Sequence, residues 1–497
     1  MRRTIGYALF AATLVFGSWL PVVFAGEAKE KPAIEQILDI LLQRGQITPE
    51  EYHSLQEKVK EEQAAGAKEP AAPVLAGIER GRPFLKSADD NFRIELGGRL
   101  QVDFDAAEAD TRLLTGPFLG SQFLIRRARI DVDAIFYKWI RAKIQSELSE
   151  GNNSSTQVSL KDAYIDLAFM PELRFRAGQF HVPFSLEELT SDNFIDFIER
   201  SIINPLTPMR DRGVKIYGDL GLWDGLITYN LGGFNGTGED TSDNNGDKDL
   251  AFRLEYSPFR NSKSFWLKGL QFAGNVTWGD EGNLTTASGQ TIARTPNRFT
   301  FFASQNAFGH RLRYGGDFAW WVGPASLKFE YDVQTNQRNG LGPGGANLDD
   351  VTGTGWYVSS TWVVTGEDKQ RSGNVIPRRP FIPFSDQSGL GAVEIGIRYA
   401  ELSFDSDSPV NLFSSSLSPV NIPGGGTSAK NGAKSLTMGV NWYFNEWTRA
   451  MLNWNYYWYD NVFGTPFSCQ LGSCSAAQLR GADKESWEIL SRLQIWF

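Results

Sequence analysis

From residue 91 to its end, the chain alternates between apolar and polar residues with a period of two, as β-strands with one apolar face do. In 92–104, for example, even positions are mostly apolar and odd positions mostly polar. The alternation predicts sixteen strands, near 91–104, 123–136, 140–148, 160–169, 173–180, 213–220, 225–232, 249–257, 268–279, 311–321, 325–334, 355–364, 391–402, 434–444, 448–459 and 485–497. A weaker stretch at 298–303 is assigned to a loop.

The predicted connections alternate between short and long. Short ones fall near 137–139, 170–172, 221–224, 322–324 and 445–447, and long ones near 105–122, 149–159, 181–212, 233–248, 280–310, 335–354, 403–433 and 460–484. This alternation is typical of antiparallel outer-membrane barrels, whose short turns face the periplasm. The exception is 365–390, which is long where a short turn is due and carries Arg378 and Arg379 between two prolines.

These patterns predict an all-β fold, a sixteen-stranded antiparallel transmembrane β-barrel. Strands can cross hydrocarbon only if the sheet closes, because an open edge would leave backbone groups without hydrogen-bond partners. A barrel of this size encloses a lumen too wide to be filled by side chains alone, unlike one of about eight strands. The predicted architecture is therefore that of a water-filled pore.

Both ends of the chain indicate export and membrane insertion. Residues 1–25 combine Arg2 and Arg3 with an apolar stretch and end on the small residue Ala25, which predicts a secretory signal peptide. At the other end, the alternating stretch closes on Phe497, and a terminal strand of this kind resembles the insertion signal of bacterial outer-membrane barrels. No later stretch approaches the roughly 18 apolar residues of a transmembrane helix. We expect the mature protein in the outer membrane of a Gram-negative cell.

The region between the signal peptide and the barrel has a helical pattern. Within 33–63 apolar residues recur at helical spacing, with a break at Gly45, which predicts a periplasmic helical segment over 26–63. This segment forms either a small helical hairpin or an oligomerising coiled coil. Residues 64–90 are rich in Ala, Gly, Pro and charge and are predicted to be a linker to the barrel domain, 91–497.

Composition excludes several classes of protein. Of 497 residues, 13% are aromatic, too many for a disordered chain, and two cysteines are too few for a disulfide scaffold. The 58 acidic residues exceed the 49 basic ones, and the net charge of −9 argues against a nucleic-acid binder. With three histidines, no catalytic residue, metal or cofactor is predicted, and we do not expect an enzyme. Cys469 and Cys474 lie in the last long loop and are expected to form a disulfide.

The polar faces of the first strands are rich in cations. The predicted anion-conducting lumen residues are Arg93, Arg99, Arg127, Arg129, Arg141, Lys143, Arg174 and Arg176. Arginine stays charged and its planar group binds oxyanions through two hydrogen bonds, so a ladder of such residues would guide anions. Acids are interleaved, including Asp131, Asp133, Asp162 and Asp166. A mixed, self-neutralising lumen of a general diffusion porin is therefore the alternative.

The third long loop, 181–212, is the second candidate for function. It mixes apolar and acidic residues with Arg200, Arg210 and Arg212. We predict that it folds into the lumen as a constriction loop lined by these three arginines; the alternative is an ordinary surface loop.

Several segments together resemble the phosphate-selective porin O/P family. They are the helical segment 41–48, the Arg-Arg-Ala-Arg strand at 126–129, the stretches 178–185 and 197–201, and Arg-Asp-Arg-Gly-Val at 210–214. The resemblance implies a sixteen-stranded homotrimer that passes oxyanions through a basic constriction and contacts the lipid bilayer and lipopolysaccharide. This chain departs from the strongly phosphate-selective members because it is acidic overall and interleaves carboxylates. The expected solutes are thus small anions, phosphate or related oxyanions; a barrel tethering the membrane to a periplasmic partner is a further alternative.

Overall fold

The protein is described from a computed structural model. The structure describes residues 33–65, 74–107, 121–149, 158–282, 291–297, 300–303, 307–341, 343–406, 431–460 and 485–497. The predicted signal peptide, 1–25, and the predicted disulfide between Cys469 and Cys474 lie outside these residues. Within the described ranges, no helix has both the length and the apolar character needed to cross a membrane.

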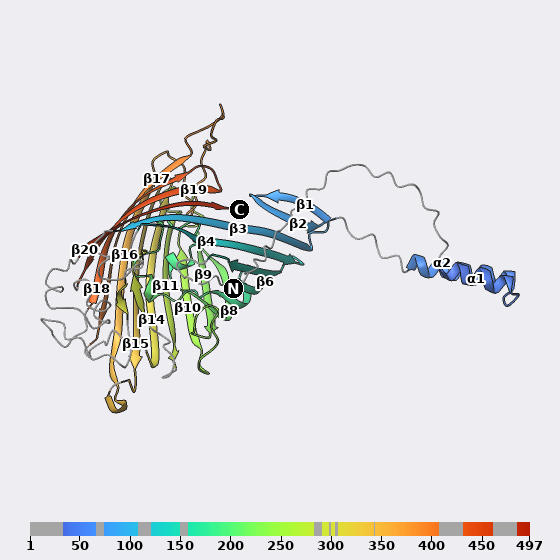
Figure 1. The fold of residues 1–497 in the computed structure, drawn as a ribbon, viewed down its shortest axis with the longest axis horizontal. Helices are drawn as coiled ribbons and strands as arrows, with labels where there is room; N and C mark the ends of the chain where they lie inside the picture. Colours follow the sequence, from blue (N-terminus) through green and yellow to red (C-terminus); the bar gives the residue numbers. More distant parts are fainter. Residues whose placement is uncertain are drawn as a thin grey trace, which may run out of the picture. The chain divides into compact units, whose positions relative to one another are not determined.

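Sixteen strands form one closed antiparallel barrel, as predicted (Figure 1). Each strand pairs with the next along the chain, and the last pairs with the first, with Ile495 opposite Leu100. The strands are β3 Phe92–Ala107, β4 Gln122–Phe136, β5 Ile140–Glu147, β6 Ser159–Met170, β7 Leu173–His181, β8 Arg210–Leu222, β9 Gly225–Phe234, β10 Asp249–Ser257, β11 Leu270–Glu281, β14 Gly309–Val322, β15 Ala325–Arg338, β16 Leu348–Val363, β17 Ala392–Asp405, β18 Asn431–Tyr443, β19 Thr448–Tyr459 and β20 Glu485–Trp496.

Side chains on the barrel strands alternate between the two faces of the sheet. On β19, Leu452 is 51% exposed whereas the next residue, Asn453, is 1% exposed. The exposed set is apolar and would face lipid, and the buried set is polar and lies in the lumen. Near the long-loop end of β19, the rings of Trp454, Tyr456 and Trp458 contact one another in sequence, with centroids 5.7 and 4.8 Å apart. Such aromatic residues suit the interface between lipid and water.

Shorter strands are not members of the ring of sixteen. Strands β1 (Val74–Glu79) and β2 (Arg82–Ser87) form a hairpin, and β2 pairs with the start of β3. The stretch 64–90 is therefore not a linker throughout, because part of it extends the sheet. Strands β12 (Ile292–Arg294) and β13 (Thr300–Ala303) form a separate two-stranded sheet in the connection from β11 to β14, so the stretch near 298–303, predicted to be a loop, contains a short strand that is not one of the sixteen barrel strands.

Arg82 explains why the hairpin stays on the barrel. Its guanidinium group lies 2.6 Å from a carboxylate oxygen of Asp131 and 2.7 Å from one of Asp133. A Cβ atom at position 97 would lie 2.4 Å from this guanidinium group, so only glycine leaves room for the contact. The ion pairs thus join the hairpin to β4 across β3.

The N-terminal unit, residues 1–72, contains two helices, α1 (Ala33–Gln43) and α2 (Pro49–Ala65). Gly45 ends the first with a positive φ of 68°. Thr48 caps the second: its backbone N–H donates to the Glu51 carboxylate at 2.8 Å, and its hydroxyl accepts from the Glu51 N–H at 3.3 Å. The Tyr52 hydroxyl donates to Asp39 at 2.6 Å and joins the helices. Oligomerisation of this unit stays a prediction.

The face assignment can be tested by placing a charge at two depths on β17. Ile397 is exposed near the middle of the strand, and Val393 lies on the same face near its periplasmic start. We expect Ile397→Arg to lower the free energy of unfolding in lipid vesicles by about 2–4 kcal/mol and Val393→Arg by about 1 kcal/mol or less. Equal costs at both positions would contradict the assignment of this face to lipid.

Candidate functional site: the lumen and its inward loop

The third long loop lies inside the barrel. We call residues 182–209, between β7 and β8, L3; it contains the short helices α4 (Leu186–Leu189) and η1 (Asn204–Leu206). Most of its apolar side chains are buried, with Ile198 and Leu206 fully covered, although Leu189 and Met209 are exposed. Ile203 and Leu206 pack in a core cluster with lumen-facing tyrosines and Phe404 of the wall, and with Phe301 of β13. A loop with this many apolar residues is stable inside a polar lumen because it forms a core there.

Lumen-facing side chains bind the backbone of L3. Arg449 of β19 donates to the carbonyl oxygens of Asn193 (3.0 Å) and Ile195 (3.2 Å), and Arg492 of β20 donates to that of Ile198 (2.7 Å). Because a loop lacks the hydrogen bonds of a sheet, such contacts supply partners for its buried backbone groups. The far wall of the barrel thus fixes the path of L3.

Glycines on β16 make the close approach of L3 possible. A built Cβ on Gly355 would lie 2.7 Å from Ile203, and one on Gly353 would lie 2.5 Å from Leu206. Both positions would normally carry a lumen-facing side chain. The second half of L3 therefore rests directly on the backbone of this strand.

One L3 carboxylate collects four guanidinium groups. The carboxylate oxygens of Asp192 lie 2.7 Å from Arg200, 2.9 Å from Arg129, 3.2 Å from Arg127 and 3.7 Å from Arg99. We call these five residues the Asp192 cluster. Arg99 comes from β3, Arg127 and Arg129 come from β4, and Arg200 comes from L3 itself. The cluster joins the loop to the wall and leaves an excess of positive charge around Asp192.

The surroundings determine the charge of the L3 acids. Burial alone would raise the pKa of the Asp192 carboxyl, but the charges of Arg127, Arg200 and the other cluster arginines outweigh it and hold that pKa well below its usual range. Glu199 behaves alike: burial opposes its ionisation, but Arg126, Arg127 and Arg492 lower the pKa of its carboxyl. Both groups are therefore anions at neutral pH.

Seven of the eight predicted lumen cations have an ion-pair partner. The pairs are Arg93–Glu95 (2.6 Å), Arg99–Asp192 (3.7 Å), Arg127–Asp192 (3.2 Å), Arg129–Glu147 (2.6 Å), Lys143–Asp133 (3.1 Å), Arg174–Asp219 (2.9 Å) and Arg176–Asp166 (2.9 Å). Arg141 is exposed and has no ion-pair partner among the described residues. Of the eight, the structure thus brings only Arg99, Arg127 and Arg129 to L3, and Arg93, Lys143, Arg174 and Arg176 pair with acids elsewhere.

The three predicted loop arginines have different positions. Arg200 belongs to the Asp192 cluster and also contacts Glu188 at 3.0 Å. Arg210 lies 2.8 Å from Asp162 on β6. Arg212 is 43% exposed and lies 3.8 Å from Asp240 in the β9–β10 loop, so its position does not agree with a role at the constriction.

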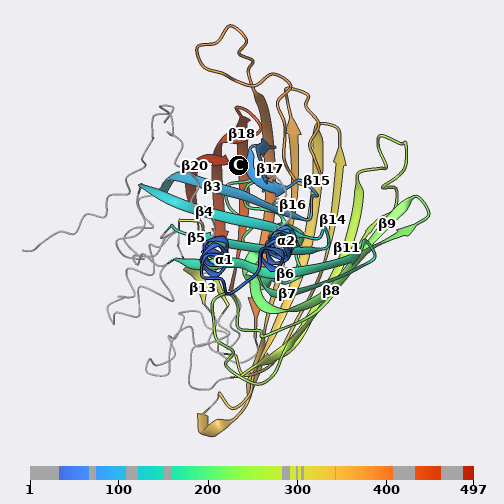
Figure 2. The ribbon, with the colours of Figure 1, turned by 90° about the vertical axis from the view of Figure 1, so that its right-hand side faces the viewer.

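A second segment enters the lumen from the periplasmic end. It is the long β16–β17 turn, residues 364–391, whose outer part projects at the top of Figure 2. Lys369 of this turn is fully buried; its ammonium lies 2.6 Å from Asp196 of L3 and also contacts Glu394. Burial alone would lower the pKa of the Lys369 ammonium, but those two carboxylates outweigh it and raise that pKa. The turn therefore fixes L3 from the periplasmic side, and this contact explains the unusual length of the turn.

Another part of the lumen wall is acidic. On β15, Glu330 and Asp332 are buried, and neither carboxylate oxygen of Asp332 has a hydrogen-bond partner within the described part of the chain. On β14, Asp317 pairs with Arg253 at 2.5 Å. The arginines of the wall that contact Asp192 thus come from β3 and β4, whereas the Glu330 and Asp332 carboxyl groups, which have no cationic partner among the described residues, lie on β15. Within the described residues, no cluster of three or more His, Cys, Asp or Glu side chains could hold a metal ion.

A closed barrel with a polar lumen and an inward loop is the architecture of an outer-membrane channel, a porin. The family model of the phosphate-selective porins O and P matches residues 94–461. The chain belongs to this family, whose members are barrels of the Gram-negative outer membrane.

Solved structures of similar barrels have low sequence identity to this chain. A loop L8 deletion mutant of Vibrio cholerae OmpT has 10% identity and a TM-score of 0.48, covering 82% of this chain and 100% of its own. DcaP of Acinetobacter baumannii has 10% identity and a TM-score of 0.45, covering 85% and 100%. The anion-selective porin from Comamonas acidovorans has 12% identity and a TM-score of 0.46, covering 82% and 100%. No curated protein matches the chain.

The lowered pKa of Asp192 predicts how pH affects stability. An unfolded Asp titrates near roughly 3.9, so a folded pKa below that value stabilises the fold above about pH 4, and the effect is lost as pH falls through the folded pKa. We expect the difference in thermal midpoint between the parent and Asp192→Asn to be constant from about pH 7 to 5 and to shrink below about pH 4. Asp386→Asn, at an exposed turn, is the control and should show no difference. A difference that already shrinks near pH 6 would be inconsistent with this account.

The contact of Lys369 with L3 gives a second expectation. Removing one partner of a buried ion pair typically costs about 3–5 kcal/mol, because the remaining charge is left without compensation. We expect Lys369→Met to lower the free energy of unfolding by this order and to increase current fluctuations of the open channel. Lys263→Met, at an exposed position of the β10–β11 turn, is the matched control. A loss under about 1 kcal/mol with an unchanged current trace would show that the turn does not hold L3.

Proposed function

We propose that the protein is a passive channel for small anions, phosphate or related oxyanions among them. The observation that carries the proposal is the Asp192 cluster, where four guanidinium groups share one carboxylate inside the lumen. A solute anion that reaches this point can replace water around the arginines and share their charge with Asp192. The driving force is the solute gradient.

The charges around the cluster support anion preference of modest strength. Six arginines here form ion pairs with five acids: the arginines are Arg99, Arg126, Arg127, Arg129, Arg200 and Arg492, and the acids are Asp103, Glu147, Glu188, Asp192 and Glu199. Each acid reduces the attraction for a passing anion without removing it. A modest excess of positive charge is suitable for conduction, since a site that binds too tightly does not release its ion.

The arginines are well arranged for oxyanions. Arg127 and Arg129 project from the same face of one strand, and the Asp192 carboxylate holds their planar groups from the loop side. Planar guanidinium groups form paired hydrogen bonds with phosphate and carboxylate oxygens. Because the contacts with Asp192 hold these groups in place, little side-chain entropy is lost when an anion binds.

A general diffusion porin is the second candidate. The pairing of seven of the eight ladder cations with acids favours it, as do the uncompensated carboxylates of Glu330 and Asp332. In such a channel the paired charges of the lumen would orient a dipolar solute more than they would select an ion.

We also propose a homotrimer in contact with the bilayer and with lipopolysaccharide. Family membership supports the trimer, and the exposed apolar residues of the strands, such as Leu452 and Ile397, support the lipid contact. The outer leaflet around a Gram-negative barrel would then supply the lipopolysaccharide.

The decisive experiment measures reversal potential in planar bilayers under a KCl gradient, with and without added phosphate. We expect chloride preference and a reduced chloride current when phosphate is added. Arg127→Gln should weaken the preference, and Asp192→Asn should strengthen it, because the two substitutions change the cluster charge in opposite directions. Arg379→Gln, on the exposed periplasmic turn, serves as the control. Equal permeability of both ions, unchanged by either cluster variant, would favour the general diffusion porin.

A further inference from the structure

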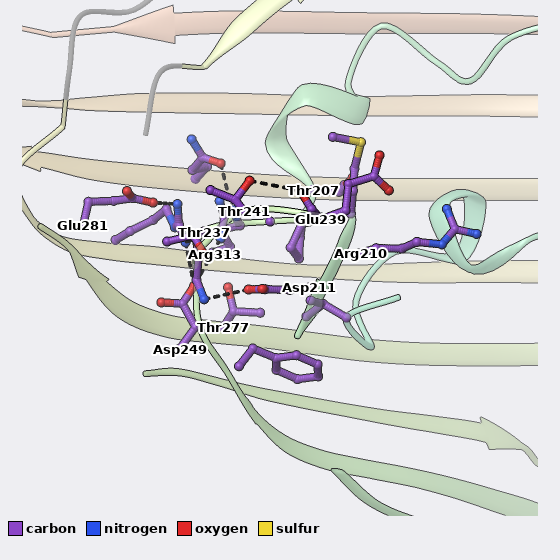
Figure 3. Close-up of a pocket in the computed structure, with 18 of the residues that line it drawn as sticks. Thr207, Arg210, Asp211, Thr237, Glu239, Thr241, Asp249, Thr277, Glu281 and Arg313 are labelled. Carbon is purple, nitrogen blue, oxygen red and sulfur yellow. Dashed lines mark hydrogen bonds and ion pairs between the residues drawn. The ribbon is translucent and has the colours of Figure 1, made fainter. Parts of the chain in front are cut away.

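A cavity of about 440 Å³ lies beside the second half of L3, near the long-loop end of the barrel (Figure 3). It lies between L3, the β9–β10 loop and the ends of β8, β11 and β14. Its polar lining includes Asp211, Thr237, Asp249, Thr277 and Arg313. The Asp192 cluster is not part of this lining. The cavity is therefore a separate place where a solute entering from outside can stop.

Two charged groups of the lining are not paired with each other or with a close counter-ion. Arg313 donates through Nε to Gln334 at 2.8 Å, but its Nη1 has no hydrogen-bond partner among the described residues, and its nearest carboxylate, Asp249, is 3.8 Å away. Asp211 accepts backbone N–H groups of Arg212 and Gly236 at 2.7 and 2.6 Å, but has no ion-pair partner in the described part of the chain.

Two hydroxyl groups of the cavity lining also lack hydrogen-bond partners. The side-chain oxygens of Thr237 and Thr277 line the cavity and lack hydrogen-bond partners among the described residues. Arg313 lies among Thr237, Asp211 and Thr277 in the close-up (Figure 3). Buried polar groups normally find partners, so this concentration of unsatisfied groups around one cavity indicates a polar ligand.

The charge balance of the lining excludes a free anion as the best ligand. The other charged groups have ion-pair partners: Arg311 lies 2.6 Å from Asp249 and also contacts Glu281, Arg210 lies 2.8 Å from Asp162, and Lys161 lies 2.5 Å from Glu239. Apart from Arg210 and Glu239, the lining contains two cations, Arg311 and Arg313, and three anions, Asp211, Asp249 and Glu281. A phosphate at Arg313 would also meet Asp211 and Asp249, and like charges this close repel.

We propose that this cavity binds a small zwitterion of the α-amino acid class. The ligand carboxylate would take the free Nη1 of Arg313, and its ammonium group would lie at Asp211. The hydroxyls of Thr237 and Thr277 would complete the hydrogen bonds, and Val182, Met209 and Phe234 supply a small apolar surface for a side chain. The proposal requires an open channel but does not depend on anion preference at the Asp192 cluster.

The test uses the full-length channel in planar bilayers, with L-serine added on the long-loop side as the probe. We expect a saturable reduction of the KCl current. Arg313→Met and Asp211→Asn should each weaken the apparent affinity for serine about tenfold or more, since charged hydrogen bonds are the strongest of those lost. Thr277→Val, which preserves shape and is a safer variant for folding, should weaken it about fivefold. Arg379→Met, on the periplasmic turn, should leave the block unchanged.

Sorbitol and phosphate on the same side are the comparison probes. A block by sorbitol as strong as that by serine would overturn the zwitterion assignment, as would a phosphate block that Arg313→Met removes. Absence of any block by serine would also overturn it. The reversal potential is recorded in the same bilayers, so a failure of anion preference is detected independently of the serine result.

Discussion

The pairing of β20 with β3 is the contact on which the rest of the molecule depends. Hydrocarbon offers no partner to a free strand edge, so a sheet that crosses it must return to its own beginning. Once the ring is closed, strict alternation places polar side chains in the lumen, and their charges must be balanced there. The ion pairs between neighbouring strands and the bonds to L3 are the result of that requirement.

L3 meets the lumen with two kinds of surface. Its isoleucines and leucines form a core against aromatic residues of the wall, whereas its carboxylates and backbone carbonyls meet the arginines. The apolar part accounts for the stability of the inward position, and the charged part accounts for the character of the passage. Because Asp192 and Arg200 belong to the same loop, positioning and electrostatics cannot be altered separately there.

Strand alternation in the sequence was sufficient to predict all sixteen barrel strands, because each strand lies between lipid and water over its whole length. The cluster arginines on β3 and β4 could be named for the same reason. Asp192 and Lys369 could not, since the partners of a loop residue depend on how the chain crosses the lumen. Arg492 could have been found: it occupies a polar position of the alternating terminal strand. The β1–β2 hairpin was missed because its pairing with β3 depends on Arg82 reaching β4.

The contacts of L3 also have a mechanical consequence. The loop is joined to β3 and β4 through Asp192, to β19 and β20 through Arg449 and Arg492, and to the periplasmic turn through Asp196. It therefore acts as a cross-brace. Lateral pressure from the bilayer that tends to flatten the barrel into an ellipse must stretch these bonds. A change in the cross-section of the barrel is therefore coupled to a change in the width of the passage beside L3.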